Sequence, residues 1–202
     1  MFGRPGHILT EAEIFQEFRD AGALLEGHFI LSSGLHSGAY VQCARVLQDA
    51  SRAARLCAAL ADKLKREVPG DIDLVVSPAL GGIIAGYEMG RQLNVPSCFF
   101  ERVDKTFTLR RGFEMPKGAR CLMMEDVVTT GLSSRECVAA AQAEGAEVAA
   151  AGCLIDRSGG KADIGVPLVA LATVDFPAYP ADGLPDDLRA IPPVKPGSRG
   201  LQ

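Results

Sequence analysis

The sequence predicts an α/β fold with a mainly parallel central sheet that is flanked by helices on both faces. Short apolar runs alternate with segments of helical periodicity along most of the 202 residues. Strands that are separated by helices pair in parallel through right-handed crossovers. The expected strands lie near residues 72, 96, 120, 148 and 167. In such a sheet, ligands bind at the carboxyl ends of the strands.

Local signals mark where the helices begin. Thr10 and Glu13 form a capping box, which predicts a first helix from about residue 11 to 21. Asp49 is the expected N-cap of the second helix. Apolar residues at helical spacing predict the remaining helices. After the first helix, the expected helices, including the one that starts at Asp49, cover residues 49–67, 83–93 and 132–143.

The two ends of this pattern are different in character. Residues 27–42 contain two short β-like runs separated by serine and glycine, as in a hairpin. Proline, glycine and aspartate accumulate from about residue 177, without periodicity. We therefore expect one domain over residues 1–202, with an extended tail from about residue 185.

Composition narrows the class of protein. The chain is 48% hydrophobic and 23% charged, as in an ordinary soluble globule. A net charge of -4 and a pI of about 5.4 argue against a nucleic-acid partner. Six cysteines without Cys-x-x-Cys spacing and three scattered histidines do not predict a zinc site. With no signal-like start and no apolar run of about 18 residues, we expect a cytoplasmic protein without a membrane partner.

The most informative stretch is residues 122–134. An apolar strand ends in Glu125 and Asp126, and the chain then turns through Thr129, Thr130 and Gly131 into a helix. Amides and hydroxyls at a helix N-terminus bind phosphate, whereas two carboxylates at a solvent-facing strand end can accept hydrogen bonds from vicinal hydroxyls. Together they predict a ribose 5-phosphate site. The simpler alternative is an acidic pair that only ends a strand in solvent; a Walker loop is excluded, because no Gly-Lys-Ser/Thr follows.

Two other loops are candidates for anion binding. Residues 77–82 form a small-residue turn between a strand and a helix, which is either an ordinary turn or a close approach to an anion. Residues 101–113 hold four cations and two acids. Such a run is usually a solvated face, but threonine, phenylalanine and leucine between the charges favour a loop that folds over a ligand.

The 122–134 stretch resembles the 5-phosphoribosyl-1-pyrophosphate (PRPP) motif of type I phosphoribosyltransferases. That resemblance implies the fold of this family, with an N-terminal hood at about residues 20–45. It also implies a pyrophosphate loop of Ala79, Leu80, Gly81 and Gly82. The PRPP-binding residues would be Glu125, Asp126, Val127, Val128, Thr129, Thr130, Gly131, Leu132 and Ser133, joined by Arg102 and Lys105. Asp126 and Lys105 are the catalytic candidates.

The basic segment matches the family's mobile catalytic loop in part. Arg102 aligns with the arginine of an Arg-Lys-x-x-Lys-x-His arrangement, and Lys105 is the candidate catalytic lysine. In the family this loop often reaches the neighbouring subunit's site, which implies a homodimer.

The hood resembles that of the orotate phosphoribosyltransferases within this family. Their hood pattern is matched by Phe29, Leu31, Ser33, Gly34, Ser37 and Tyr40. Ser32 stands where many members have a lysine. Arg157 follows a strand, where an isolated arginine is usually a surface residue, but the family places a guanidinium on the orotate carboxylate there. The implied orotate-binding residues are Ser32, Tyr40, Thr129 and Arg157.

The resemblance implies transfer of the phosphoribosyl group from PRPP to orotate, with Mg²⁺ held mainly by PRPP rather than by protein ligands. The first alternative is a purine phosphoribosyltransferase, which would lack the hood between Phe29 and Tyr40. The second is a non-catalytic PRPP-sensing regulator, which would carry a DNA-binding module or a basic surface.

Overall fold

The computed structural model describes residues 9–31 and 33–195 and contains a six-stranded sheet. Five strands pair in parallel, and β5 at one edge runs antiparallel to β4. This confirms the predicted fold class. In spatial order the strands are β5 (Thr106–Leu109), β4 (Ser97–Val103), β3 (Leu74–Pro78), β6 (Arg120–Val128), β7 (Glu147–Asp156) and β8 (Leu168–Thr173).

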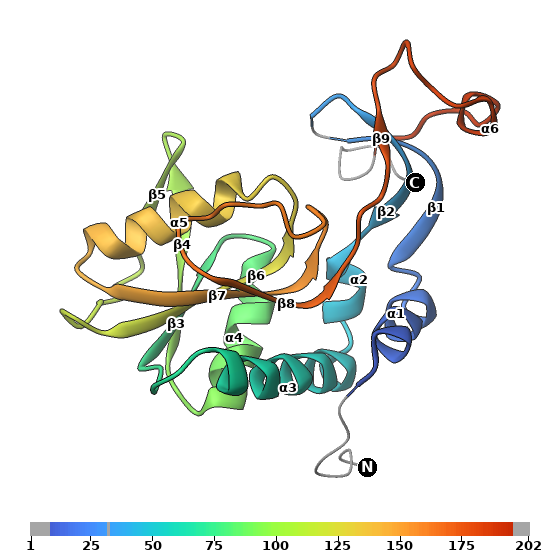
Figure 1. Ribbon diagram of the computed structural model, residues 1–202. Helices are drawn as coiled ribbons and strands as arrows, with labels where there is room; N and C mark the ends of the chain where they lie inside the picture. The colour runs from blue at the N-terminus through green and yellow to red at the C-terminus, as the bar shows by residue number, and fades with distance from the viewer. Residues whose placement is uncertain (1–8, 32, 196–202) are drawn as a thin grey trace.

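Helices cover both faces of this sheet (Figure 1). Helices α3 (Ala50–Glu67) and α4 (Gly82–Leu93) pack on one face, and α5 (Leu132–Ala143) packs on the other. Side chains alternate along β6: Leu122 and Met124 join the α3 and α4 core, whereas Cys121 and Met123 join the α5 core. Among the described residues, no helix combines the length and apolar composition that crossing a bilayer requires.

The helix starts that the sequence marks are formed as predicted. Helix α1 (Glu11–Asp20) has the Thr10 capping box, and the Asp49 side chain accepts a hydrogen bond of 3.0 Å from the Arg52 amide at the start of α3. The short helix α2 (Cys43–Leu47) was not predicted, because five residues are too few to show a helical period.

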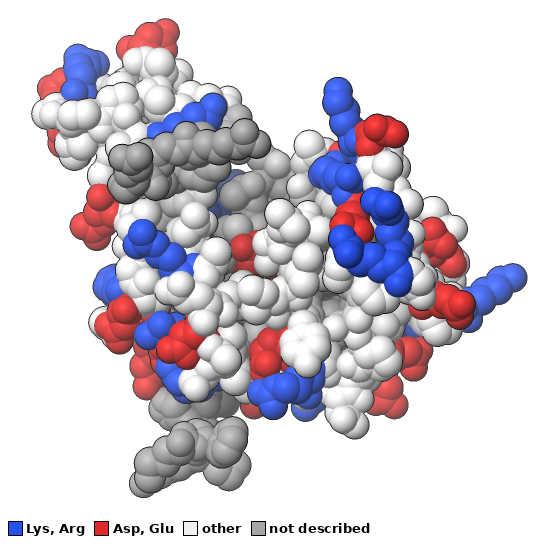
Figure 2. All heavy atoms as spheres, turned by 180° about the vertical axis from the view of Figure 1, so that it is seen from behind, with Lys and Arg blue, Asp and Glu red and all other residues white. Residues whose placement is uncertain are grey.

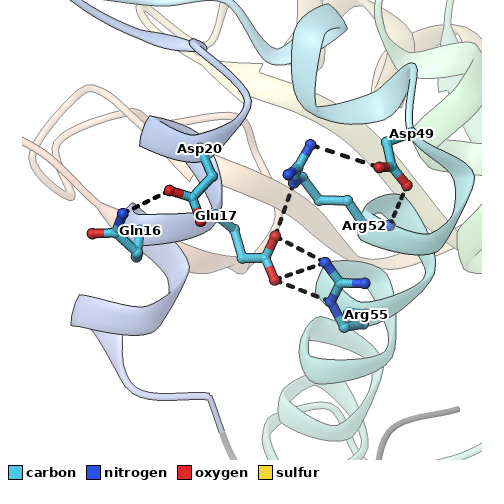
Figure 3. Close-up of polar contacts among 6 residues, drawn as sticks. All are labelled: Gln16, Glu17, Asp20, Asp49, Arg52 and Arg55. Atoms are coloured by element: carbon cyan, nitrogen blue, oxygen red, sulfur yellow. Dashed lines mark hydrogen bonds and ion pairs between the residues drawn. The ribbon is translucent and has the colours of Figure 1, made fainter. Parts of the chain in front are cut away.

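An ion-pair cluster fixes α1 against α3 (Figure 3). The Glu17 carboxylate accepts from Arg52 and Arg55, each at 2.8 Å. The Arg52 amide is also held by Asp49, so the cluster includes the start of α3. Because α1 leads directly into the hood, these contacts join the hood to the sheet domain.

The hood is a separate three-stranded antiparallel sheet. Its strands β1 (Leu24–Ile30) and β2 (His36–Val41) form the predicted hairpin, and β9 (Ala178–Tyr179) pairs with β2. In Figure 1 the hood lies to one side of the main sheet. The third strand comes from the opposite end of the chain, and a pairing of two residues leaves no periodic signal in the sequence.

The segment after β9 returns to the hood rather than extending away from it. A helical turn, α6 (Asp186–Arg189), interrupts the tail that was expected to be extended from about residue 185. The Ile191 carbonyl lies 2.8 Å from Nδ1 of His28, and Nε2 of His28 lies 2.6 Å from Nδ1 of His36. Val194 then bridges to Phe29. Long-range contacts with the hood therefore order a segment whose composition predicts no structure.

The basic segment 101–113 is largely a hairpin rather than an irregular loop. Strands β4 and β5 pair from Phe100 to Leu109, and Asp104 and Lys105 form the turn with φ values of 49° and 71°. Phe107 is buried, whereas Thr106 and Thr108 are exposed. The period of two was present in the sequence, but the surrounding charges obscured it.

Candidate active site

The acidic pair lies at the carboxyl end of β6, but it is not solvent-facing as expected. Glu125 is only 7% exposed, and Asp126 is half-buried. The reason is the sheet itself, because β6 remains paired with β7 through Val128 and Asp156, beyond the acids. The thiol of Cys43 in α2 donates to the Asp126 carbonyl at 3.6 Å and covers the same strand end from the hood side.

Burial changes the charge that this pair carries in the ligand-free protein. The pKa of Glu125 is raised to about 9. Burial is the largest cause, and the charge of Asp126 is the second. Burial also raises the pKa of Asp126, although hydrogen bonds from the Val127 amide and from Glu125 oppose the effect. Near neutral pH, this raised pKa keeps Glu125 as a neutral carboxyl group beside Asp126.

The turn after β6 has the geometry of an anion site. Gly131 adopts a left-handed conformation with φ of 77°, and a Cβ atom there would lie 2.7 Å from Ile164 Cγ2. Only glycine allows this turn. The first amides of α5 have no carbonyl partner within the helix, and the hydroxyls of Thr129, Thr130 and Ser133 are exposed beside them. Leu132 is also exposed, and Val127 and Val128 continue the strand.

The predicted pyrophosphate loop lies directly beside this pair. The Ala79 amide donates to the Phe100 carbonyl at 2.8 Å, and α4 begins at Gly82. A Cβ atom at Gly81 would lie 2.9 Å from a carboxylate oxygen of Asp126. The two predicted anion-binding loops therefore meet at Asp126.

The hood brings its aromatic side chain to the same edge of the sheet. Arg157 follows β7, and its amide donates to the Val128 carbonyl at 2.7 Å. Its guanidinium lies 5.6 Å from the centroid of the Tyr40 ring. Burial raises the pKa of Tyr40, and the Arg157 charge opposes the effect. The structure thus unites Tyr40 and Arg157, whereas Ser32 lies outside the described residues.

The hairpin brings Arg102, but not the Lys105 side chain, to the motif. The Arg102 guanidinium donates to Glu136 at 2.5 Å and to Ser133 at 3.4 Å, and it stacks on Phe107. Lys105 offers Arg102 its backbone carbonyl, while its side chain makes no ion pair with a described residue. Figure 2 shows lysine and arginine side chains gathered on the side of the molecule that carries this hairpin.

Two buried side-chain atoms in the described part of the chain have no hydrogen-bond partner: Oε2 of Glu125 and Nε of Arg157. Both belong to residues that the sequence assigned to the site. A buried polar atom without a partner is costly, so ligands that pair with these atoms would recover that cost on binding. The described residues include no cluster of three or more side chains able to hold a metal ion by themselves.

Comparisons with known proteins identify the class. The chain matches the phosphoribosyl transferase domain model over residues 45–171, and it belongs to the phosphoribosyltransferase family. Within that family it groups with the orotate phosphoribosyltransferases. The protein of that name from Maricaulis maris is 57% identical over 193 residues, which cover 96% of this chain and 100% of the relative.

Solved structures agree in fold. The crystal structure of orotate phosphoribosyltransferase from Aeropyrum pernix superposes with a TM-score of 0.65 and 29% identity, covering 79% of this chain and 92% of that one. An adenine phosphoribosyltransferase from Thermoanaerobacter pseudethanolicus gives 0.63 at 17% identity, with 82% and 100% covered. The similarity to the adenine phosphoribosyltransferase concerns the fold alone. The fold therefore does not indicate which base the protein uses.

Two residues at the site were not predicted. Cys43 follows the hood pattern by three residues, but a lone cysteine in an apolar context carries no signal. Phe176 lies in the connection between β8 and β9, with its ring centroid 5.8 Å from the Arg157 guanidinium. Phe176 and Arg157 are 19 positions apart in the sequence, and the segment between them contains a proline. No local periodicity in the sequence indicates that they are in contact.

The raised pKa of Glu125 makes stability depend on pH. The folded protein keeps this proton up to about pH 9, whereas the unfolded chain loses it near 4.5, so the free energy of unfolding falls as pH rises between these values. Glu125→Gln removes this loss. The difference in unfolding free energy, variant minus wild type, should be at least about 1.4 kcal/mol larger at pH 8.5 than at pH 5.

Urea unfolding of both ligand-free proteins at the two pH values measures this difference. Glu67→Gln, which removes an exposed carboxyl group, is the matched control. A Glu125→Gln stability difference that is the same at both pH values would mean that Glu125 is already ionised in the folded protein.

Proposed function

We propose that this chain transfers the 5-phosphoribosyl group from PRPP to orotate, giving orotidine 5′-monophosphate and pyrophosphate. One observation carries the proposal: the buried acidic pair, the amide-rich turn and the Arg157 guanidinium lie at one edge of the sheet. This edge can hold a sugar phosphate and a planar anion next to each other. The reaction belongs to pyrimidine (UMP) biosynthesis.

The ribose 5-phosphate occupies the turn between β6 and α5. Its phosphate accepts hydrogen bonds from the first amides of α5 and from the hydroxyls of Thr129, Thr130 and Ser133. The two ribose hydroxyls face Glu125 and Asp126. A hydroxyl that donates to Glu125 favours its charged form, and this contact provides the missing partner of Oε2.

The diphosphate lies between the loop at residues 79–82 and the basic hairpin. Asp126 is crowded against Gly81, so the leaving group and the ribose hydroxyls are held by adjacent loops. Carboxylate oxygens suit Mg²⁺, but two neighbouring acids are too few for a protein cage, and phosphate oxygens would supply most ligands. When bound there by PRPP, Mg²⁺ neutralises charge on the departing diphosphate.

The reaction is a displacement at C1 of the ribose. The bond from C1 to the diphosphate oxygen breaks as a ring nitrogen of orotate bonds to C1 and releases its proton to solvent, through a transition state with oxocarbenium character. Asp126 stabilises the positive charge that develops on the sugar, and neither acid acts as a nucleophile. Arg102 and Lys105 stabilise the departing pyrophosphate.

Orotate binds between the hood and the end of β7. Its carboxylate meets the planar guanidinium of Arg157, which can donate two parallel hydrogen bonds. The resemblance adds Tyr40, Thr129 and Ser32 as further orotate-binding residues.

A homodimer would complete the site. Leu80, Ile84 and Tyr87 are 84%, 51% and 69% exposed at the start of α4, and such an apolar surface fits a second copy of the chain. The Lys105 side chain makes no ion pair with the described residues of its own subunit. Lys105 in the hairpin turn therefore acts at the neighbouring subunit's site.

Six buried free thiols fit a reducing cytoplasm.

Base selectivity tests the proposed function. Pyrophosphate release from PRPP, measured side by side with orotate, adenine and hypoxanthine, should occur with orotate alone, because Arg157 requires a carboxylate. Release with a purine would favour the purine phosphoribosyltransferase. No release with any base, despite PRPP binding, would favour the regulator.

Subunit mixing tests the role of Lys105. Lys105→Ala should lower turnover by about tenfold or more while PRPP binding changes little, because the charge acts mainly in the transition state. Mixing this variant with Glu125→Gln/Asp126→Asn should restore activity, since one site of each heterodimer then has both an intact motif and an intact partner hairpin.

Differently tagged chains establish that heterodimers have formed. Active heterodimers support action between subunits. If the heterodimers form and stay inactive, Lys105 either serves its own site or is not the catalytic cation. The next cations of the hairpin to examine are Arg102, Arg110 and Arg111.

A further inference from the structure

The Arg157 guanidinium has an aromatic ring from each of two segments. Tyr40 of β2 lies 5.6 Å from it, and Phe176, in the connection between β8 and β9, lies 5.8 Å from it. Both distances are within the range of cation–π attraction. Nε of Arg157 is buried without a hydrogen-bond partner among the described residues. Among the described residues, the two rings rather than a carboxylate therefore hold this cation.

The segment that carries Phe176 is tied to the loop that carries Arg157. The Val174 amide donates to the Asp156 carbonyl at 2.8 Å. Lys161 and Asp175 form an ion pair of 2.8 Å across the two segments. A Cβ atom at Gly159 would lie 2.9 Å from the Asp175 carboxylate, so the Gly159 backbone lies close against the Asp175 side chain. These contacts fix where the Phe176 ring stands relative to Arg157.

The Arg157 loop is rigid at its base for a second reason. The Asp156 carboxylate accepts hydrogen bonds from the Ser158 amide at 2.7 Å and from the Gly160 amide at 2.9 Å. The backbone of Arg157 is thus well ordered, while its long side chain retains several rotatable bonds. Aromatic faces that restrict this side chain reduce the entropy lost when orotate binds.

We propose that Phe176 is a positioning residue for orotate, because it holds the Arg157 guanidinium in the orientation that meets the orotate carboxylate. The inference rests on the proposed function and deepens it. Phe176 acts through Arg157 and not by contact with the reacting atoms. The segment after β8 therefore contributes to base recognition as well as to the hood.

Four single variants test this role through steady-state kinetics with each substrate varied. Phe176→Leu keeps an apolar side chain but removes the aromatic face, and it should raise KM for orotate about three- to tenfold. KM for PRPP should change by less than about twofold, since Phe176 acts through the Arg157 guanidinium and not through the residues assigned to PRPP. Phe176→Tyr retains the ring and should restore KM for orotate to the wild-type value.

Two reference variants separate the possible failures. Val174→Ala shortens an apolar side chain in the same segment but does not change the rings that contact the Arg157 guanidinium. It should leave KM for orotate unchanged. Arg157→Ala should raise it about tenfold or more, the scale of a charge-assisted hydrogen bond. If Arg157→Ala has no effect, the proposed orotate contact is wrong, and the role of Phe176 falls with it.

If Arg157→Ala raises KM for orotate and Phe176→Leu does not, the positioning role is wrong while the proposed function stands. Parallel rises for orotate and PRPP in Phe176→Leu, or a Phe176→Tyr variant as weak as Phe176→Leu, would assign Phe176 to the hydrophobic core instead. Thermal unfolding of each variant establishes that the proteins compared are folded.

Discussion

Close approach of α4 to the sheet allows the site to form. A Cβ atom at Gly86 would lie 2.7 Å from Ser77 Oγ, and one at Gly82 would lie 3.0 Å from the Met124 carbonyl, so neither position leaves room for a side chain. With these glycines, the start of α4 sits against β3 and β6. The neighbouring Gly81 consequently meets Asp126, and the loop at residues 79–82 opens at the same place as the turn before α5. A larger residue on this face would move one anion-binding loop away from the other.

The same place concentrates polar groups that the fold does not pair. Oε2 of Glu125 and Nε of Arg157 are buried without partners among the described residues, and the pKa of Glu125 rises to about 9 as a result of burial and of Asp126. Such groups lower the stability of the ligand-free protein. In return, the site needs little rearrangement to bind a diol and a carboxylate. Elsewhere, ion pairs such as those of Glu17 with Arg52 and Arg55 serve the fold, since they join the hood to the sheet domain.

Features with a local physical cause could be predicted from the sequence. The helix starts at Thr10 and Asp49, the alternation of strands and helices, and the acidic end of β6 all depend on residues within a few positions of one another. The burial of Glu125 was missed because it depends on β7 continuing beside β6. The hairpin of β4 and β5 was missed because its charges outweighed the alternation around Phe107. The roles of His28 and Phe176 depend on contacts with distant segments, which a single sequence does not reveal.

The central claim is that Glu125 and Asp126 bind the hydroxyls of the PRPP ribose. Calorimetric titration of PRPP with Mg²⁺, in the absence of orotate, measures this binding directly for wild type and for Glu125→Gln/Asp126→Asn. The account predicts that the variant stays folded and that its affinity for PRPP falls by about tenfold or more, the scale of hydrogen bonds to charged groups. Equal affinity in a folded variant would contradict the assignment of the acidic pair to the ribose.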